Sequence, residues 1–263
     1  MIFRTIIAIC FLALWHPPSA PAQEAQLIAR AQRVSVAALD SGFQAVPFAR
    51  WLATLRGPNW CAVAVPLRTG LAWTYTGSAL WSGGDGTRAD SGDVSWTMTI
   101  VAARDVGSVR VALVRGFVSQ LARYEPGKPP RLSLLACRGS QLFGLEPAGD
   151  SAARHAYDHW GDALLQHAEL LLDLPLHDGQ LFGQKPPRDD ALYAWTVAAV
   201  RPEVLSALPT GCGRGAGPRF ELSYRSLPEH AVIEWQPGLG ITRYAYGHHG
   251  TPAAADVRLR ACR

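Results

Sequence analysis

Two histidines separated by three residues are the side chains of this sequence whose spacing best suits metal chemistry. His155 and His159 enclose an Ala-Tyr-Asp segment, and on a helix this spacing brings both imidazoles to one face. Read as H-x-x-D-H, the segment is one methylene short of the inverted zincin motif H-x-x-E-H. Asp158 or Asp162 could complete a zinc site for hydrolysis. No glutamate stands there as a general base, however, so solvated or helix-capping histidines are the alternative interpretation.

Nucleophilic hydrolysis and calcium binding have weaker support. The sequence contains no G-x-S-x-G motif. The segment Gly149-Asp150-Ser151 resembles the G-D-S of some esterases, but Asp and Ser are also the residues expected to cap a helix that begins there. The aspartates between Gly83 and Asp93 could offer oxygens to calcium, but their spacing is not that of an EF-hand, so we interpret this segment as a hairpin loop. We therefore predict no catalytic residue and no cofactor.

A candidate binding surface lies near the C-terminus. Tyr244, Tyr246 and His248 alternate along the chain. If Ile241 and Ala245 face inward, these three side chains share the opposite face of a strand. Aromatic and imidazole groups on an exposed strand favour binding of a partner. Ordinary cross-strand pairing of the same side chains is the alternative.

The elements that must position these side chains are mostly strands. From Val94 to Ile100, apolar and hydroxyl residues alternate with a period of two, as a half-buried strand requires. The same alternation marks residues 109–113, 220–224 and 257–259. Turn residues separate these runs, among them Pro237-Gly238, where we expect a hairpin with Gly238 at positive φ. The pattern predicts a mostly β (α+β) fold of curved antiparallel sheet.

Two helical segments are expected beside the strands. Apolar residues recur at helical spacing before Arg56-Gly57-Pro58, which indicates a short amphipathic helix near the mature N-terminus. A second helix is predicted to begin at Asp150 and Ser151, whose side chains offer capping oxygens. Six residues then share one face: Ala156, Trp160, Ala163, Leu164, His167 and Leu171. Its last part, Glu169 to Leu174, could instead be a strand.

An internal repeat suggests two duplicated β-meanders. Pro66 to Trp73 and Pro175 to Phe182 both read P-L-x-x-G-x-x-aromatic, and a similar strand follows each. We accordingly expect five segments along the chain. They are a signal peptide at 1–22, an N-terminal helical segment at 23–60, a first β half at 61–150, a linking helix at 151–174 and a second β half at 175–263.

The cysteines indicate an oxidising compartment. After residue 22 the chain has four, Cys61, Cys137, Cys212 and Cys262, without a C-x-x-C motif. An even number at wide spacing in an exported protein favours two disulfides, for which three connectivities are possible. If the halves are duplicated, each half closes on its own pair, which gives Cys61–Cys137 and Cys212–Cys262.

The N-terminus has the features of a removable secretory signal. Arg4 precedes an apolar run from Thr5 to Trp15, which is too short to span a bilayer, and Ala20-Pro21-Ala22 offers a small-residue cleavage site. Cleavage there leaves a mature chain from Gln23 with 24 basic and 21 acidic residues. Because the arginines are scattered, we expect no nucleic-acid partner, and we expect no transmembrane segment after cleavage.

Two short segments resemble motifs of known proteins. Pro66 to Tyr75 (PLRTGLAWTY) and Glu234 to Tyr244 (EWQPGLGITRY) are similar to the opening P-L-x-x-G-x-x-W-x-Y and closing W-x-P-G-x-G-I-x-x-Y motifs of uncharacterised bacterial extracytoplasmic families, some of them lipoproteins. The resemblance covers about two dozen residues and implies a curved antiparallel β domain outside the cytoplasm. It carries over no catalytic residue.

These observations favour an exported, non-enzymatic envelope or secreted protein, in the periplasm or outside the cell, that binds a ligand or a protein partner. The alternative hypothesis is a metal-dependent hydrolase that uses His155 and His159. Metal analysis of the mature protein distinguishes the two.

Overall fold

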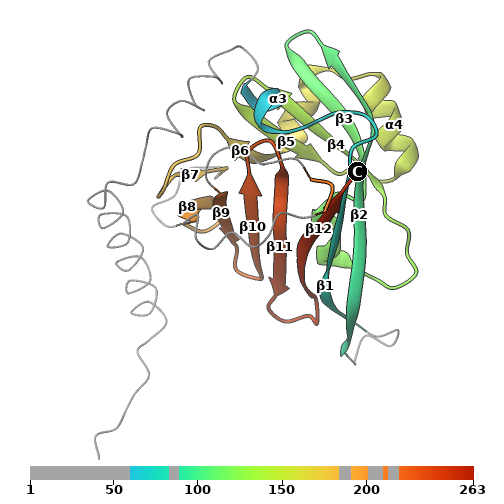
Figure 1. Cartoon of the computed structure of the whole chain (residues 1–263), viewed down its shortest axis with the longest axis vertical. Coiled ribbons are helices and arrows are strands. Elements are labelled where there is room, and N and C mark those ends of the chain that lie inside the picture. Colours follow the sequence, from blue (N-terminus) through green and yellow to red (C-terminus); the bar gives the residue numbers. More distant parts are fainter. Residues whose placement is uncertain (1–59, 83–88, 184–190, 201–209, 213–218) are drawn as a thin grey trace, which may run out of the picture. The chain divides into compact units, whose positions relative to one another are not determined.

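The computed structural model describes residues 60–82, 89–183, 191–200, 210–212 and 219–263. Within these ranges, 12 strands form one antiparallel sheet, with a few short helices beside it (Figure 1). The strands are β1 Ala72–Ser82, β2 Ala89–Val106, β3 Val109–Arg115, β4 Leu132–Arg138, β5 Gln141–Leu145, β6 Glu169–Asp173, β7 Leu181–Phe182, β8 Trp195–Val200, β9 Arg219–Arg225, β10 Glu229–Gln236, β11 Gly240–His248 and β12 Ala254–Cys262. The helices are α3 Trp60–Ala64, η1 Val118–Arg123, α4 Asp150–Asp158 and η2 Asp162–His167. The mostly β, antiparallel fold predicted from the sequence is confirmed.

Two six-stranded meanders make up this sheet. Its strand order is β6-β5-β4-β3-β2-β1-β12-β11-β10-β9-β8-β7, so the first strand of one meander pairs with the last strand of the other. The sheet curves until its edge strands β6 and β7 lie beside each other, without a β-ladder between them in the described chain (Figure 1). We call the place where β6 and β7 meet the β6–β7 seam. The sheet is therefore nearly closed.

The two P-L-x-x-G segments fold alike. Gly70 and Gly179 both have positive φ, 86° and 75°. The amide of Gly70 donates to the carbonyl of Ile100 on β2, and the amide of Gly179 donates to the carbonyl of Val197 on β8, each at 2.8 Å. Only a glycine adopts this left-handed conformation without strain, so the shared glycine has a physical reason. The repeat seen in the sequence is thus a repeat of turn geometry, and β7 corresponds to β1.

The meander boundary differs from the predicted segments. The first meander extends through β6, which ends at Asp173, and so includes the segment predicted as a linking helix. That segment contains α4, the 3-10 helix η2 and strand β6 in place of one helix. Gly161 has extended backbone between α4 and η2, and the apolar run of β6 pairs with β5, which confirms the strand alternative for residues 169–174. Sheet pairing overrides the helical periodicity because it buries Leu171 and Leu172.

The start of α4 also departs from expectation. Its N-cap is Gly149, without a side-chain cap. The Asp150 carboxylate instead accepts hydrogen bonds from the Leu132 amide (2.8 Å) and from Arg115 (3.0 Å), and these bonds lower its pKa. Asp150 therefore ties the helix to the first residue of β4 and the last residue of β3. Behind α4, apolar side chains of β3 and β4 form a second core cluster with Trp160 and Leu165.

Short helical segments fill the two ends of the curved sheet. α3 packs at the end where β4 turns into β5, since the Cys61 amide donates to the carbonyl of Gly139 at 3.0 Å. η1 lies at the opposite end, between β3 and β4 in the chain, and contacts β11 and β12. Val118 and Leu121 of η1 are buried in the main core. The space inside the sheet is therefore packed.

Both disulfides expected from duplicated halves are present. Cys61 bonds to Cys137, and Cys212 bonds to Cys262. The first bridge fastens α3 to β4, and the second fastens the segment at 210–212 to the end of β12.

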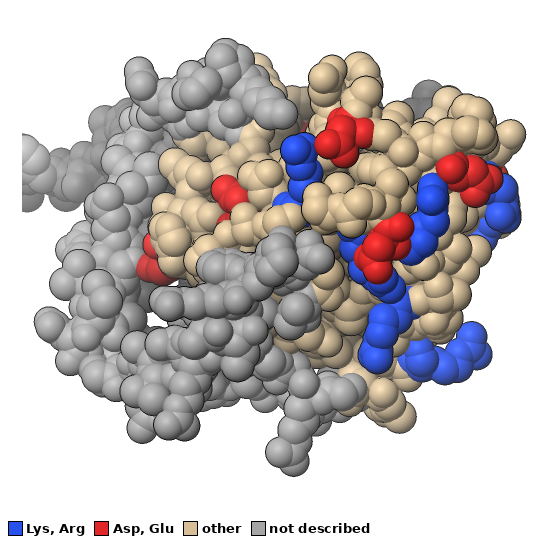
Figure 2. All heavy atoms as spheres, turned by 90° about the horizontal axis from the view of Figure 1, so that it is seen from above, with Lys and Arg blue, Asp and Glu red and all other residues tan. Residues whose placement is uncertain are grey.

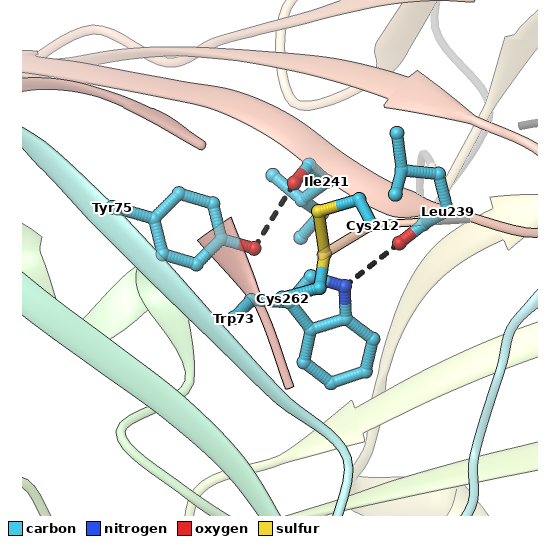
Figure 3. Close-up of a disulfide and its surroundings, with 6 residues drawn as sticks. All are labelled: Trp73, Tyr75, Cys212, Leu239, Ile241 and Cys262. Atoms are coloured by element: carbon cyan, nitrogen blue, oxygen red, sulfur yellow. Dashed lines mark hydrogen bonds between the residues drawn. A yellow bond between two sulfur atoms is a disulfide. The ribbon is translucent and has the colours of Figure 1, made fainter. Parts of the chain in front are cut away.

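The opening and closing motif segments meet beside the second bridge (Figure 3). The Trp73 indole donates to the carbonyl of Leu239 at 2.8 Å, and the Tyr75 hydroxyl donates to the carbonyl of Ile241 at 3.0 Å. Both aromatic side chains are buried, and burial raises the pKa of Tyr75 far above its usual range. The two aromatic side chains of the opening segment thus bind backbone carbonyls of the closing segment, next to its Pro237-Gly238 turn. These contacts give both motif segments a shared structural role.

The signal peptide and the N-terminal helix predicted from the sequence lie outside the described residues. In the described part of the chain, no helix is long and apolar enough to cross a membrane.

Candidate functional site

The histidine pair lies on the outer surface. His155 is in the last turn of α4 and His159 follows it, with ring centroids 4.3 Å apart. Nδ1 of His159 lies 3.1 Å from the carbonyl oxygen of His155. Asp162 faces Arg138 at 3.9 Å, and the backbone carbonyl of Asp158 accepts a hydrogen bond from Arg104. Within the described ranges, no group of three His, Cys, Asp or Glu side chains is placed to hold a metal.

The predicted surface of Tyr244, Tyr246 and His248 has the wrong orientation. Tyr244 is 4% exposed and belongs to the core, and Tyr246 packs against that core. The cause is a β-bulge in the predicted hairpin: Glu234 pairs with Arg243, but Trp235 pairs with Ile241. The extra residue between them reverses the alternation, so Ile241 and Tyr244 both face the interior. His248, at the end of β11, is half-buried beside Thr251.

A row of side chains crosses the inner face of the sheet near the η1 end. The register aligns Trp195 of β8 with Tyr224 of β9, Tyr224 with Ala231 of β10, and Ala231 with Tyr246 of β11. The rings of Trp195 and Tyr224 lie 5.3 Å apart. Tyr224, Ala231 and Tyr246 are half-buried, at the border between core and solvent.

Three glutamates surround this row. Glu229 starts β10 and accepts a hydrogen bond from the Tyr246 hydroxyl at 3.2 Å. Glu169 starts β6 at the β6–β7 seam. Glu146 follows β5 and accepts a hydrogen bond from Ser119 of η1. We call Glu146, Glu169, Glu229, Trp195, Tyr224 and Tyr246 the tyrosine–glutamate cluster.

The electrostatics of the cluster are dominated by negative charge. Burial raises the pKa of Glu169, and the neighbouring Glu146 and Glu229 raise it further. Burial also raises the pKa of Tyr224, with added contributions from Glu169 and Glu229. The pKa of Tyr246 rises to about 12 through burial and Glu229, although Arg123 opposes this rise. Each of these groups therefore disfavours the negative charge of the others, and the cluster concentrates charge of one sign.

Trp195 supplies a hydrogen-bond donor to the cluster. Its side chain is 5% exposed, and its Nε1 has no hydrogen-bond partner of standard geometry among the described residues. The indole nevertheless lowers the pKa of Glu169 as a donor to its carboxylate, so this contact is looser than a standard hydrogen bond. Glu169 itself keeps solvent-exposed surface although protein desolvates it. A carboxylate in this position is reachable from solvent and held beside a buried donor.

A different arrangement of charge lies on the outer face of the sheet. Glu234 is buried and pairs with Arg219 at 2.9 Å, and Arg243 forms a two-bond contact with Asp256 at 2.9 and 2.7 Å. This contact raises the pKa of Arg243 and lowers that of Asp256. Figure 2, which views the molecule from above, shows basic and acidic side chains next to one another on the described surface. These ion pairs hold neighbouring strands together.

The interior also contains an apolar cavity of about 40 Å³ near the α3 end. Val65, Leu67, Trp73, Trp235 and Ile241 are among its lining residues. A space of this size holds a few water molecules and is far smaller than the pockets that enclose ordinary organic ligands. We therefore place the candidate site at the tyrosine–glutamate cluster.

Of the residues predicted as a surface, only Tyr246 belongs to this cluster. Glu169 lies in a segment that the sequence predicts as helix or strand, and Tyr224 lies in a predicted strand, neither with a predicted role. The available signal is weak, since Tyr224 merely ends one predicted apolar alternation. Register and curvature, which bring β6 to β8, are not visible in the sequence.

Comparison with known proteins leaves the family open. No family model matches the chain, and no curated protein matches it. Two solved structures are similar. One is a Bacteroides fragilis protein described as exported and as having a YmcC-like fold, with 11% identity over 74% of this chain and 96% of that one, at a TM-score of 0.36. The other is a Parabacteroides distasonis protein described as a lipoprotein, with 8% identity over 75% and 96%, at a TM-score of 0.37. Neither likeness is close enough to carry an inference about function.

Proposed function

We propose that this chain is an exported, non-enzymatic envelope or secreted protein that binds a ligand through the tyrosine–glutamate cluster. The observation that carries the proposal is the buried indole N–H of Trp195, which has no standard hydrogen bond in the described chain and lies beside the solvent-reachable Glu169. Buried polar groups are normally satisfied, and those that are not often await a ligand or water. Ligand-binding sites commonly combine aromatic side chains with a few hydrogen-bond acceptors and donors.

Export rests on two observations. The first is the N-terminal signal pattern, which ends at Ala22. The second is the pair of disulfides, because such bridges persist in oxidising compartments. N-terminal sequencing of the native protein should read Gln23 first. A chain that begins at Met1, or beyond Glu24, contradicts this cleavage.

The binding site is tested by screening and substitution. We expect compounds that raise the melting temperature to lose most of their effect in the variant Tyr224→Ala, which removes one ring of the cluster. The double variant His155→Ala/His159→Ala is the control, because these exposed side chains lie in the last turn of α4 and directly after it. Hits that bind Tyr224→Ala as well as wild type place the site elsewhere.

The same control tests the alternative hydrolase. A zinc ion retained through dialysis by wild type and lost by the His155→Ala/His159→Ala variant would favour that function over the one proposed.

A further inference from the structure

The chemistry of the tyrosine–glutamate cluster narrows the class of ligand. Carboxylates reach it from three separate elements: Glu146 after β5, Glu169 on β6 and Glu229 on β10. Two of them hold neutral hydroxyl donors, since Ser119 donates to Glu146 and Tyr246 donates to Glu229. An ionised carboxylate accepts several hydrogen bonds, so these contacts leave acceptor capacity unused. Charge of one sign is concentrated here.

The aromatic rings add a second, independent feature. In the register, Ala231 lies between Tyr224 and Tyr246, so only a methyl group separates the positions of the two rings on the inner face. Trp195 extends the row at 5.3 Å from Tyr224 and is buried. Tyrosine and tryptophan faces attract cations through the negative face of the ring.

In the described part of the chain, little positive charge opposes these carboxylates. Arg123, at the end of η1, influences Tyr246. The charged groups that act on Glu169 are Glu146 and Glu229, both acidic. The indole of Trp195 lowers the pKa of Glu169 and so favours its ionised form, but the indole adds no charge of its own. Bringing like charges together costs free energy, which a cation would offset.

We propose that the ligand carries an alkylammonium or guanidinium group, which binds between the tyrosine rings and the carboxylates of Glu169 and Glu229. This inference rests on the function proposed above. Such a group donates hydrogen bonds to the carboxylates while its alkyl part contacts the rings. The source is either a small amine or a basic side chain of a peptide, and the two share this chemistry.

The test is calorimetric titration of the full mature protein at constant ionic strength. The probes are spermidine and an acetylated trilysine peptide as the two cationic sources, maltotriose as a neutral compound, and calcium chloride as a metal ion. The variants are Glu169→Gln and Glu229→Gln, which keep the side-chain shape and an acceptor oxygen. Asp105→Asn is the matched control, because it removes a carboxylate paired with Arg110 on an exposed part of the sheet.

We expect at least one cationic probe to bind wild type and the Asp105→Asn control equally. The affinity should fall about tenfold or more in each glutamine variant, as the loss of a charge-assisted hydrogen bond predicts. Binding by spermidine alone identifies a small amine, and binding by the peptide alone identifies a basic side chain. Melting temperatures of the variants that are no lower than that of wild type exclude unfolding as the cause.

Other outcomes overturn the inference at different levels. If no cationic probe binds, or if maltotriose or calcium alone binds and depends on Glu169, the cation proposal is wrong while the binding site stands. If cationic probes bind wild type and both glutamine variants equally, the cation proposal is wrong. If Tyr224→Ala also binds them unchanged, the proposed site is wrong as well.

Discussion

A methyl group added to Gly77 should disrupt the junction between the two meanders. Gly77 lies on β1 opposite Val257 of β12, and this is the strand pair that joins first and last strand. An ideal Cβ built on Gly77 lies 1.9 Å from the carbonyl oxygen of Asp256 and 2.8 Å from the Cα of Val257. Because both contacts are with backbone, no side-chain rotation relieves them. In Gly77→Ala, therefore, the strands must separate by about 1 Å.

The cost follows from three contributions. Overpacking strain costs about 1–3 kcal/mol, and weakening two ladder hydrogen bonds costs about 1 kcal/mol each. The lower entropy of the unfolded alanine chain returns about 0.4–1 kcal/mol. The free energy of unfolding should fall by about 3 kcal/mol, which corresponds to a decrease in melting temperature of about 6–12 °C for a chain of this size.

The control is a glycine on β11, the strand that pairs with β12 on its other side. Gly247 of β11 pairs with Ala254 of β12, and an ideal Cβ there has no atom within 4 Å. Gly247→Ala should change the free energy of unfolding by less than about 1 kcal/mol. Thermal and urea unfolding of both variants measure the difference. Equal melting temperatures for the two would refute the close approach of β1 and β12.

Three further predictions concern the hairpin, the cluster and the histidines. Gly238 has φ 74°, so Gly238→Val should cost about 1–3 kcal/mol in urea unfolding, and a wild-type value would contradict the turn. The raised pKa of Glu169 means that the folded state binds its proton more tightly, so this group lowers stability as the pH rises from its unfolded pKa through its folded pKa. Glu169→Gln should therefore be more stable than wild type at neutral pH and lose that advantage near pH 4, about the pKa of an unfolded glutamate; a constant difference speaks against the shift. The double change His155→Ala/His159→Ala should alter the free energy of unfolding by no more than about 0.5 kcal/mol, and a larger loss of stability would show that the pair has a structural role.

Features decided by short-range chemistry could be predicted from the sequence. Period-two alternation located β2, β3, β9 and β12, because a half-buried strand requires it whatever its neighbours are. The P-L-x-x-G repeat pointed to duplicated meanders because a glycine at positive φ is required in both turns. The disulfide pairs expected from that duplication are the ones formed.

Features decided by distant partners could not be predicted. The helical spacing from Ala156 to Leu171 is real, but β5 offers Leu171 and Leu172 a pairing strand, and burial in the sheet prevails. Likewise, strict alternation along β11 places Tyr244 opposite Ile241, and one bulged residue brings both inside. A bulge inserts one residue and leaves no signature in the composition of the strand. The alternation of inward and outward side chains therefore predicts the wrong face for the residues of β11 that follow the bulge.

The candidate site follows from the same duplication that the sequence revealed. In the first meander, β1 has 11 residues and pairs along its length with β12. Within the described ranges, its counterpart β7 spans Leu181–Phe182 and pairs with β8 alone. A full-length β7 would present a ladder to β6, as β1 does to β12. Strands β6 and β7 instead touch without a ladder in the described chain, and Glu169, at the start of β6, is exposed to solvent at this seam. The tyrosine–glutamate cluster therefore lies where the two meanders meet without strand pairing.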